Sequence, residues 1–283
     1  MDVFPFSESA ERYGIVRISV AHLRRQPVYA AEILNQLLLG EVVPVFESQN
    51  GYFFVQMKDG YRGWVTTLSL CVVEENEARE WLESATAQVR ARYSAATASE
   101  DPESEIVSDL VLGARVIPLH QARQSTLIRL PDGQEALVAT ADLNSLKDAP
   151  PAPLNAAAIL KTARRFLGIP YLWGGTSTKA FDCSGLVQTV FRLHHLELPR
   201  DASQMYHVGK SLDIDAAFSQ LRPGDLLFFG KSLRRITHVA LSLGGSEYIH
   251  AEGWVKYNSL DPQSPIYNTE KGQTFIAAKR ILE

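Results

Sequence analysis

The C-terminal half of the chain contains a cysteine, an aspartate and a glycine-rich turn. Their residue types and their spacing suit thiol chemistry. Cys183 is one of only two cysteines in 283 residues. It follows Gly174-Gly175 in the stretch YLWGGTSTKAFDCSGL, and it comes directly after Asp182, a residue type that caps helices. A thiol in the first turn of a helix meets unpaired N–H groups and the positive end of the helix dipole, which favour the thiolate. Cys183 is therefore a candidate nucleophile, with a buried structural thiol as the alternative.

Two histidines lie in apolar runs, HVALSL and EYIH, that are separated by Gly-Gly-Ser at 244–246. A hairpin with a three-residue loop pairs residue 240 with residue 250. It makes His238 and His250 diagonal neighbours on one face, about 7–8 Å apart at the backbone. That geometry suits a base oriented by a second polar group. A zinc site on Cys183, His238 and His250 is the competing interpretation, although zinc sites usually have three or four ligands, often two of them close in sequence.

The elements that must position these residues lie in residues 155–283. Residues 155–168 and 183–195 predict helices, because apolar residues recur at helical spacing. From Leu221 onward the chain is rich in strands, with the runs DLLFFG, THVALSL, EYIHAEG and FIAAKRIL. This order indicates an α+β domain with a helical half and a sheet half.

The N-terminal half contains an internal duplication. AEILNQLLLGEVVPVF, residues 31–46, aligns without a gap on SEIVSDLVLGARVIPL, residues 104–119, at an offset of 73. Each unit has short strand-like runs, and turn pairs such as Asn50-Gly51 and Asp59-Gly60 break them, so a small barrel is expected. We expect one barrel over residues 1–75, a second over 76–147 that begins with a helix at 76–92, and a stiff proline-rich linker over 148–154.

Composition is that of an ordinary soluble protein, with 46% hydrophobic residues, 21% charged residues and a net charge of −4. No basic run or zinc-module spacing indicates nucleic acid, and no apolar run of about 18 residues indicates a membrane span. The first residues, MDVFPFSESAERYGIVR, contain acids and no apolar signal-peptide core. We therefore expect a cytoplasmic protein, or a periplasmic or secreted one if a signal peptide had been removed.

Residues 155–283 contain a series of short motifs in this order: YLWGG, FDCSGL, LPRDASQM, LRPGDLLFF, THVAL and YIHAEG. On these motifs, the segment resembles the NlpC/P60 family of papain-like cysteine peptidases. This resemblance implies that Cys183 is the nucleophile, His238 the base and His250 the third residue of a triad. Tyr171 would donate to the oxyanion beside the backbone N–H of Cys183. No metal or organic cofactor is implied. The residues expected to contact substrate are Trp173, Asp182, Ser184, Arg200 and Asp201.

The two repeats resemble bacterial SH3-like domains, and their order before the peptidase is similar to γ-D-glutamyl-L-diamino acid endopeptidases that act on muropeptides. In that group the first SH3-like domain borders the active site and recognises a free amino group with an acid and a tyrosine. Glu32 and Tyr61 are the matching candidates. The second repeat has Gln134 where the first has Tyr61, and Leu137 where the first has Trp64, so we interpret it as structural.

One motif departs from that group. After the catalytic helix the group has Arg-Asp-Ser-x-x-Gln, whereas this chain has RDASQM at residues 200–205. Arg200 and Asp201 match. The serine is replaced by Ala202, which leaves open which group takes over its contact; Ser203 or a backbone group is a candidate.

The resemblance implies a cysteine endopeptidase that hydrolyses the γ-D-glutamyl-L-diamino acid bond of peptidoglycan-derived peptides with a free N-terminal L-Ala, in muropeptide recycling. The thiolate of Cys183, paired with a charged His238, would attack the γ-carbonyl. Two alternatives stay open: an N-acetylmuramoyl-L-alanine amidase or related acyltransferase, and a wall-binding protein with an inactive peptidase fold. The preferred diamino acid and the oligomeric state stay open as well.

Overall fold

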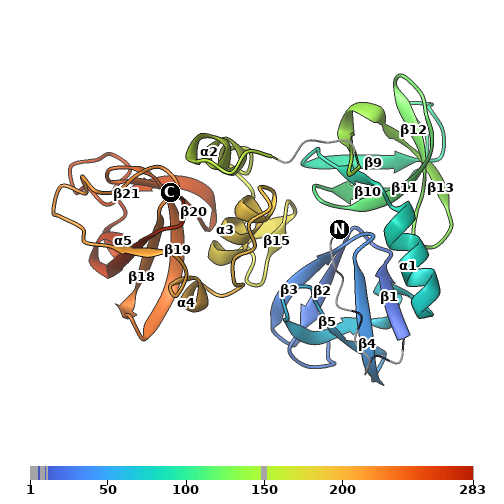
Figure 1. The fold of residues 1–283 in the computed structure, drawn as a ribbon, viewed down its shortest axis with the longest axis horizontal. Coiled ribbons are helices and arrows are strands. Elements are labelled where there is room, and N and C mark those ends of the chain that lie inside the picture. Colours follow the sequence, from blue (N-terminus) through green and yellow to red (C-terminus); the bar gives the residue numbers. More distant parts are fainter. Residues whose placement is uncertain (1–5, 7–9, 11, 148–151, 283) are drawn as a thin grey trace. The chain divides into compact units, whose positions relative to one another are not determined.

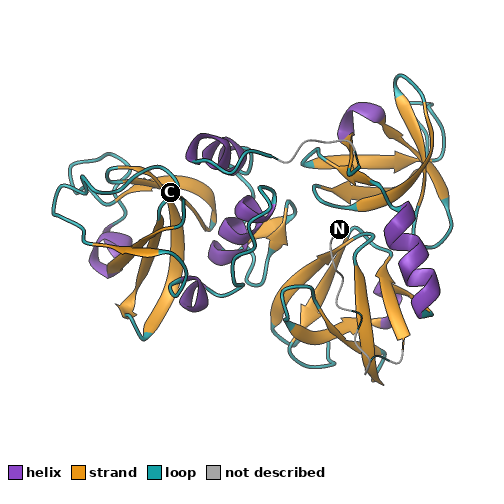
Figure 2. Cartoon of the chain, viewed as in Figure 1, coloured by secondary structure: helices purple, strands orange, loops and turns teal. Residues whose placement is uncertain are grey.

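The computed structural model describes residues 6, 10, 12–147 and 152–282. The chain divides into two compact units, Met1–Pro150 and Pro151–Glu283 (Figure 1). Strands make up most of the regular structure in both units, and the helices are short (Figure 2). Most of the expected linker, residues 148–151, lies outside the described residues.

The first unit begins with a barrel-like sheet of seven strands in the order β3-β2-β6-β5-β4-β1-β7. The turn pair Asn50-Gly51 joins β4 to β5 with positive φ at both residues, 51° and 77°, as a type I′ hairpin requires. Asp59-Gly60 lies between β5 and β6, so both expected hairpins are confirmed. The strands are β1 (Arg12–Val16), β2 (Val20–Arg24), β3 (Ile33–Leu38), β4 (Val42–Gln49), β5 (Tyr52–Gln56), β6 (Arg62–Thr66) and β7 (Leu70–Val73).

A second seven-stranded sheet repeats this topology in the order β10-β9-β13-β12-β11-β8-β14, strand for strand. The offset found in the sequence recurs in space, because β3 begins at Ile33 and its counterpart β10 at Ile106. The strands are β8 (Ala87–Val89), β9 (Tyr93–Thr97), β10 (Ile106–Val111), β11 (Arg115–Gln121), β12 (Ser125–Arg129), β13 (Glu135–Ala139) and β14 (Leu143–Ser145).

The helix between the barrels is shorter than the expected 76–92. Helix α1 (Glu75–Ser84) starts with a capping box formed by Glu74 and Glu77 and ends where Ala85 leaves helical geometry, at φ −76° and ψ 67°. Residues 87–89 form β8 instead, which pairs with β11 and β14. The prediction was wrong there because the second barrel needs a strand equivalent to β1 between β11 and β14, and that pairing overrides the helical spacing of the apolar residues.

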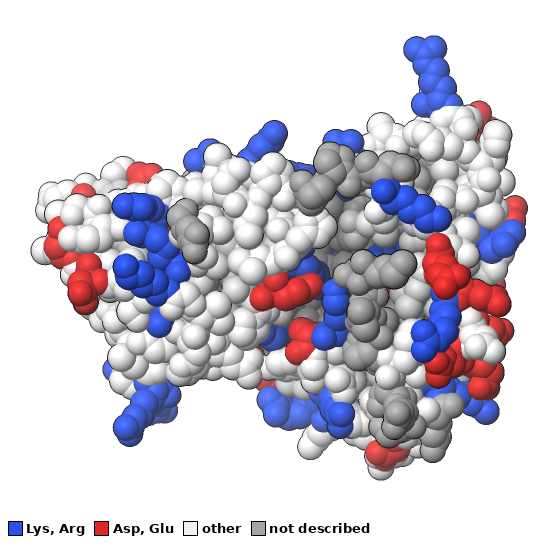
Figure 3. All heavy atoms as spheres, viewed as in Figure 1, with Lys and Arg blue, Asp and Glu red and all other residues white. Residues whose placement is uncertain are grey.

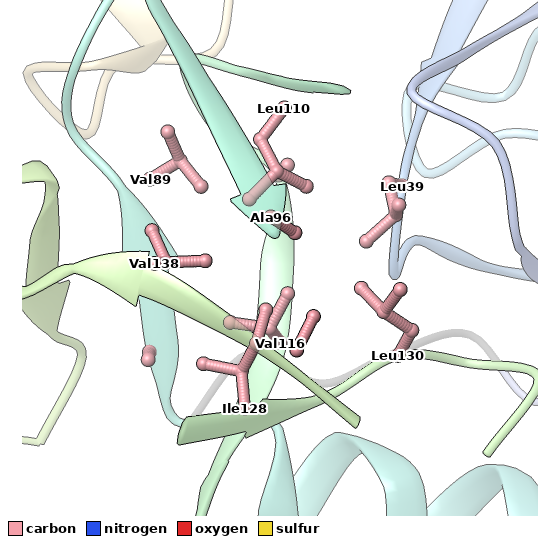
Figure 4. Close-up of a cluster of buried hydrophobic side chains, with 11 residues drawn as sticks. Leu39, Val89, Ala96, Leu110, Val116, Ile128, Leu130 and Val138 are labelled. Carbon is pink, nitrogen blue, oxygen red and sulfur yellow. The ribbon is translucent and has the colours of Figure 1, made fainter. Parts of the chain in front are cut away.

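The two barrels are joined through the turn after β3. Leu39 is fully buried and belongs to the core cluster of the second barrel, where it faces Leu130 (Figure 4). The backbone N–H of Arg115 donates to the carbonyl of Leu39 at 2.9 Å. A side chain at Gly40 would lie 2.1 Å from the carbonyl oxygen of Arg115, so only glycine fits this contact. The second barrel therefore packs against the turn after β3 of the first barrel and holds it in place.

The second unit combines short helices with a six-stranded sheet in the order β17-β22-β18-β19-β20-β21. The expected helices are confirmed but end earlier, α2 (Ala156–Arg164) at Arg164 and α3 (Cys183–Arg192) at Arg192. Helix α3 packs against β19 and β20 (Figure 1). The other elements are β15 (Thr176–Ser177), β16 (Ala180–Phe181), α4 (Ala202–Met205), β17 (Lys210–Leu212), β18 (Leu226–Ser232), β19 (Arg235–Gly244), β20 (Glu247–Glu252), β21 (Trp254–Ser259), α5 (Thr269–Thr274) and β22 (Phe275–Arg280).

Charged side chains of both signs lie on the face that Figure 3 displays, some of them in small groups of one sign. Within the described residues, no helix has the length and apolar character needed to cross a lipid bilayer.

Candidate active site

Cys183 is the first residue of α3, and its position is set by the residue before it. Asp182 caps the helix: its Oδ1 accepts from the backbone N–H of Gly185 at 2.6 Å, as expected from the sequence. Cys183 is 8% exposed. The backbone N–H of Val239, the residue after His238, lowers the pKa of this thiol, which places the thiol near β19.

The glycines around the cysteine allow two backbone segments to touch. A side chain on Gly185, in the first turn of α3, would lie 2.0 Å from the carbonyl oxygen of Gly175. A side chain on Gly175 would lie 2.6 Å from the carbonyl oxygen of Ala180. The close approach that Gly175 permits is to the protein's own backbone. The turn and the helix are packed against each other, which fixes the direction of the Cys183 side chain.

Arg200 lies beneath this turn rather than on a substrate-facing surface. It is 3% exposed, and its guanidinium bonds both carboxylate oxygens of Asp182. It also donates to the hydroxyl of Ser184 at 2.9 Å. The structure therefore differs from the expectation of substrate contact for Arg200. Its bonds hold Asp182 and Ser184, which are themselves buried, on either side of Cys183.

The predicted histidine register is confirmed. Leu241 pairs with Ile249 and Ser242 with Tyr248 across β19 and β20, which is the register deduced from the sequence. A bulge shortens the turn, since Gly244 pairs with Glu247. His238 Nε2 and His250 Nδ1 consequently lie 2.8 Å apart.

Asn258 on β21 extends this chain of side chains and was missed by sequence reasoning. Its Oδ1 lies 2.9 Å from Nε2 of His250. The signal was present, because a hairpin around Gly253 pairs His250 with Lys256 and puts Asn258 diagonally across from His250, as β20 and β21 do. The arrangement is therefore Cys183, His238, His250 and Asn258, from α3 and three adjacent strands.

Burial controls the charge of the thiol and the base. Burial, together with the nearby carboxylate of Asp182, raises the pKa of Cys183 to about 11, against the lowering effect of the backbone N–H groups of Val239 and Ser184. Burial also lowers the pKa of His238 well below its ordinary value, as does His250. Both shifts favour the neutral thiol and the neutral imidazole.

Tyr171 and Trp173 flank the site from the segment before β15. The backbone N–H of Tyr171 donates to the carbonyl of Gly253 at 2.9 Å, which ties this segment to the β20–β21 turn. Burial raises the pKa of Tyr171, and so does the charge of Cys183, which marks their proximity. The phenol therefore stays protonated and can donate a hydrogen bond. Trp173 is 61% exposed.

The segment that carries the altered motif forms the short helix α4. Asp201 stands at its N-cap position and accepts from the backbone N–H groups of Gln204 and Met205 through its carbonyl. Ala202 is buried, whereas Ser203 is exposed. Ser203 is thus on the surface, but it does not occupy the position of the family serine.

Glu32 and Tyr61 belong to one end of the first barrel. Glu32 precedes β3 and its carboxylate pairs with Arg25 at 2.6 Å, just beyond the end of β2. Tyr61 follows the Asp59 turn and packs on the barrel core. The side chain of Asn35 on β3 donates to Asp59 at 3.2 Å, which joins the two regions.

In the described part of the chain, no group of three or more His, Cys, Asp or Glu residues could hold a metal ion. The fold and the site define a thiol hydrolase of papain-like architecture, which places the protein among the cysteine peptidases.

Residues 168–272 match the NlpC/P60 family, and residues 23–70 match the bacterial dipeptidyl-peptidase SH3 domain. The chain is a cysteine peptidase that carries an NlpC/P60 domain behind a bacterial SH3 domain.

Among its relatives is a γ-D-glutamyl-L-lysine dipeptidyl-peptidase of Bacillus cereus, 29% identical over 235 residues that cover 78% of this chain and 68% of the relative. Dipeptidyl-peptidase 6 of Lysinibacillus sphaericus is 27% identical over 279 residues, 93% of this chain and 97% of that protein. The crystal structure of an NlpC/P60 family protein from Bacillus cereus has the same fold, with a TM-score of 0.75 at 24% identity over 96% of this chain and all of that one.

Proposed function

We propose that the protein hydrolyses the γ-D-glutamyl-L-diamino acid bond of peptidoglycan-derived peptides that have a free N-terminal L-Ala. The observation that carries this proposal is the position of the Cys183 thiol, at the start of α3 and near β19, the strand of His238. Nε2 of His238 lies 2.8 Å from Nδ1 of His250. Relatives named γ-D-glutamyl-L-lysine dipeptidyl-peptidase and dipeptidyl-peptidase 6 support the bond type.

The reaction begins from the neutral pair. The thiol proton of Cys183 moves to Nδ1 of His238, the ring nitrogen not bonded to His250, as the sulfur attacks the γ-carbonyl carbon. The tetrahedral intermediate collapses when His238 returns that proton to the leaving amine. A γ-glutamyl thioester stays on Cys183, and water, deprotonated by His238, then hydrolyses it to the acid and the free thiol.

Two donors stabilise the oxyanion in this scheme. The backbone N–H of Cys183 is one of the first-turn amides of α3, which have no partner within a helix. The hydroxyl of Tyr171 is the second donor. Because its pKa is raised, it remains a donor across the working pH range.

Glu32 and Tyr61 are proposed to bind the free amine of L-Ala. An ammonium group needs a carboxylate and hydrogen-bond acceptors, which these side chains provide. Arg25 already pairs with Glu32, so the substrate amine would compete with a surface ion pair, and exposed pairs contribute little. Peptides trimmed to L-Ala are products of wall breakdown, so the proposed role is muropeptide recycling in the cytoplasm.

The test is mass spectrometry of L-Ala-γ-D-Glu-meso-diaminopimelate after incubation with the protein. We expect release of L-Ala-γ-D-Glu from the free peptide but not from its N-acetylated form, and none with Cys183→Ala. Glu32→Gln should raise KM about tenfold or more, since a hydrogen bond to a charge is lost. Glu47→Gln, an exposed acid of the same barrel, is the control. Equal cleavage of the acetylated peptide would remove the role given to Glu32 and Tyr61. Failure to cleave either peptide would contradict the function.

A further inference from the structure

We propose that Asn258 is a positioning residue that selects the tautomer of both histidines and so decides whether His238 can accept the thiol proton. The inference rests on the proposed roles of Cys183 and His238. It follows from the direction in which each hydrogen bond of the chain must run.

The orientation of the Asn258 side chain is fixed at both ends. Its Nδ2 donates to the carbonyl of Ile266 at 2.8 Å, in the loop that follows β21. A carbonyl cannot donate, so the amide nitrogen must face Ile266 and the amide oxygen must face His250. That oxygen lies 2.9 Å from Nε2 of His250.

The direction of this hydrogen bond fixes the direction of the next one, between His250 and His238. An amide oxygen only accepts, so Nε2 of His250 must carry a hydrogen. A neutral imidazole has one N–H, which leaves Nδ1 of His250 as an acceptor. The contact of 2.8 Å between the histidines is therefore a donation from Nε2–H of His238. His238 is left with a lone pair on Nδ1, the nitrogen that must receive the proton of Cys183.

The neutral state of His250 makes this selection necessary. His250 is fully buried, and burial lowers its pKa. Among the charges that face it, Glu252 on its own strand raises the pKa, whereas Lys256 on β21 and Lys271 on α5 lower it. Glu252 and Lys271 are themselves paired at 2.6 Å. His238 on β19 and Tyr248 on β20 are the titratable groups whose rings contact that of His250, each with ring centroids 5.0 Å away. A neutral His250 without Asn258 has two tautomers of similar energy, and in one of them His238 carries its hydrogen toward the thiol.

The experiment compares Asn258→Ala, Asn258→Asp and the control Ser259→Ala in the full chain. Asp is isosteric with Asn and keeps the acceptor for His250, but it sets a carboxylate against the carbonyl of Ile266. Ser259 is the next residue on β21 and is fully buried, and its hydroxyl bonds Ser246 and the backbone of Asp261. Its loss therefore disturbs the same strand without touching a histidine.

Three quantities are measured: kcat, the melting temperature, and the rate of alkylation of Cys183 by iodoacetamide at neutral pH, followed by peptide mapping. Cys71 serves as the internal reference. For Asn258→Ala we expect kcat and Cys183 alkylation to fall about tenfold, the worth of one buried hydrogen bond, with Cys71 unchanged. Asn258→Asp should recover most of the kcat while melting lower, and Ser259→Ala should melt lower with normal kcat.

Unchanged kcat and alkylation in Asn258→Ala would overturn the inference. Equal losses of kcat and alkylation rate in all three variants, in step with their melting temperatures, would also overturn it, because that pattern is a structural effect. The alkylation readout needs no peptide substrate. A wild-type protein that fails to cleave the peptide, while Asn258→Ala still slows alkylation, would therefore reject the proposed function and leave this inference standing.

Discussion

Replacing Arg200 distinguishes between two possible roles of this residue, holding the site together and binding substrate. Arg200 and Asp182 form an ion pair whose side chains are 2% and 9% exposed. In Arg200→Met, Asp182 keeps its bonds from the N–H groups of Gly174 and Gly185 but remains a buried, unpaired carboxylate. Leaving one member of a buried pair uncompensated costs about 3–5 kcal/mol.

That cost converts to a melting shift. An unfolding entropy of about 2.1 cal/mol/K per residue, over a unit of roughly 130 residues, gives about 0.28 kcal/mol per degree. The second unit of Arg200→Met should therefore melt about 10–18 °C lower in scanning calorimetry. The melting temperature of Arg200→Lys should lie between those of the wild type and Arg200→Met, because lysine restores the charge but not the bidentate hydrogen bond.

The matched control is Arg280→Met. Arg280 also bonds a buried aspartate, Asp225, through two nitrogens, but its side chain is 20% exposed. We expect a smaller melting shift and unchanged kcat/KM. A melting temperature for Arg200→Met within about 3 °C of wild type, together with a raised KM alone, would refute the reasoning and return Arg200 to a substrate-binding role.

Three further predictions follow from the same site. Alkylation of Cys183 should rise steadily between pH 7 and pH 10, because its pKa is raised to about 11; a rate that is already level at pH 7 would indicate an ion pair. The buried histidines have folded-state pKa values below 6.5, so the unfolded chain binds protons that the native state does not, and stability should fall below pH 6.5 by about 1.4 kcal/mol per pH unit for each histidine. Denaturant titrations at pH 7 and pH 5.5 measure this loss, and equal stabilities would contradict the neutral pair. Tyr171→Phe should lower kcat about 100-fold or more with little change in KM, as removal of an oxyanion donor does, and an unchanged kcat would exclude that role.

Local patterns in the sequence were enough to predict much of the fold. The duplication, the Asn50-Gly51 hairpin and the register of β19 on β20 depend on turn residues and period-two alternation within short segments. The capping of α3 by Asp182 is equally local. These features are set by a few neighbouring residues, so a sequence can reveal them.

Other features depend on distant partners. Apolar residues at 85 and 89 fit a helical face, yet both are also buried when the chain leaves α1 and forms β8, so spacing alone could not place the helix end. Arg200 and Asp182 lie 18 residues apart, and nothing in their types shows that their pair is enclosed. The raised pKa of Cys183 likewise comes from burial, which no motif displays.

The most direct test of the central claim is to trap the acyl-enzyme. The protein is mixed with L-Ala-γ-D-Glu-meso-diaminopimelate, quenched in acid during turnover, digested and mapped by mass spectrometry. The proposed mechanism predicts that the peptide containing Cys183 gains the mass of L-Ala-γ-D-Glu less one water, and that the adduct is lost on treatment with hydroxylamine. Turnover of the peptide by Cys183→Ala, or an adduct on any other residue, would contradict the assignment of Cys183 as the nucleophile.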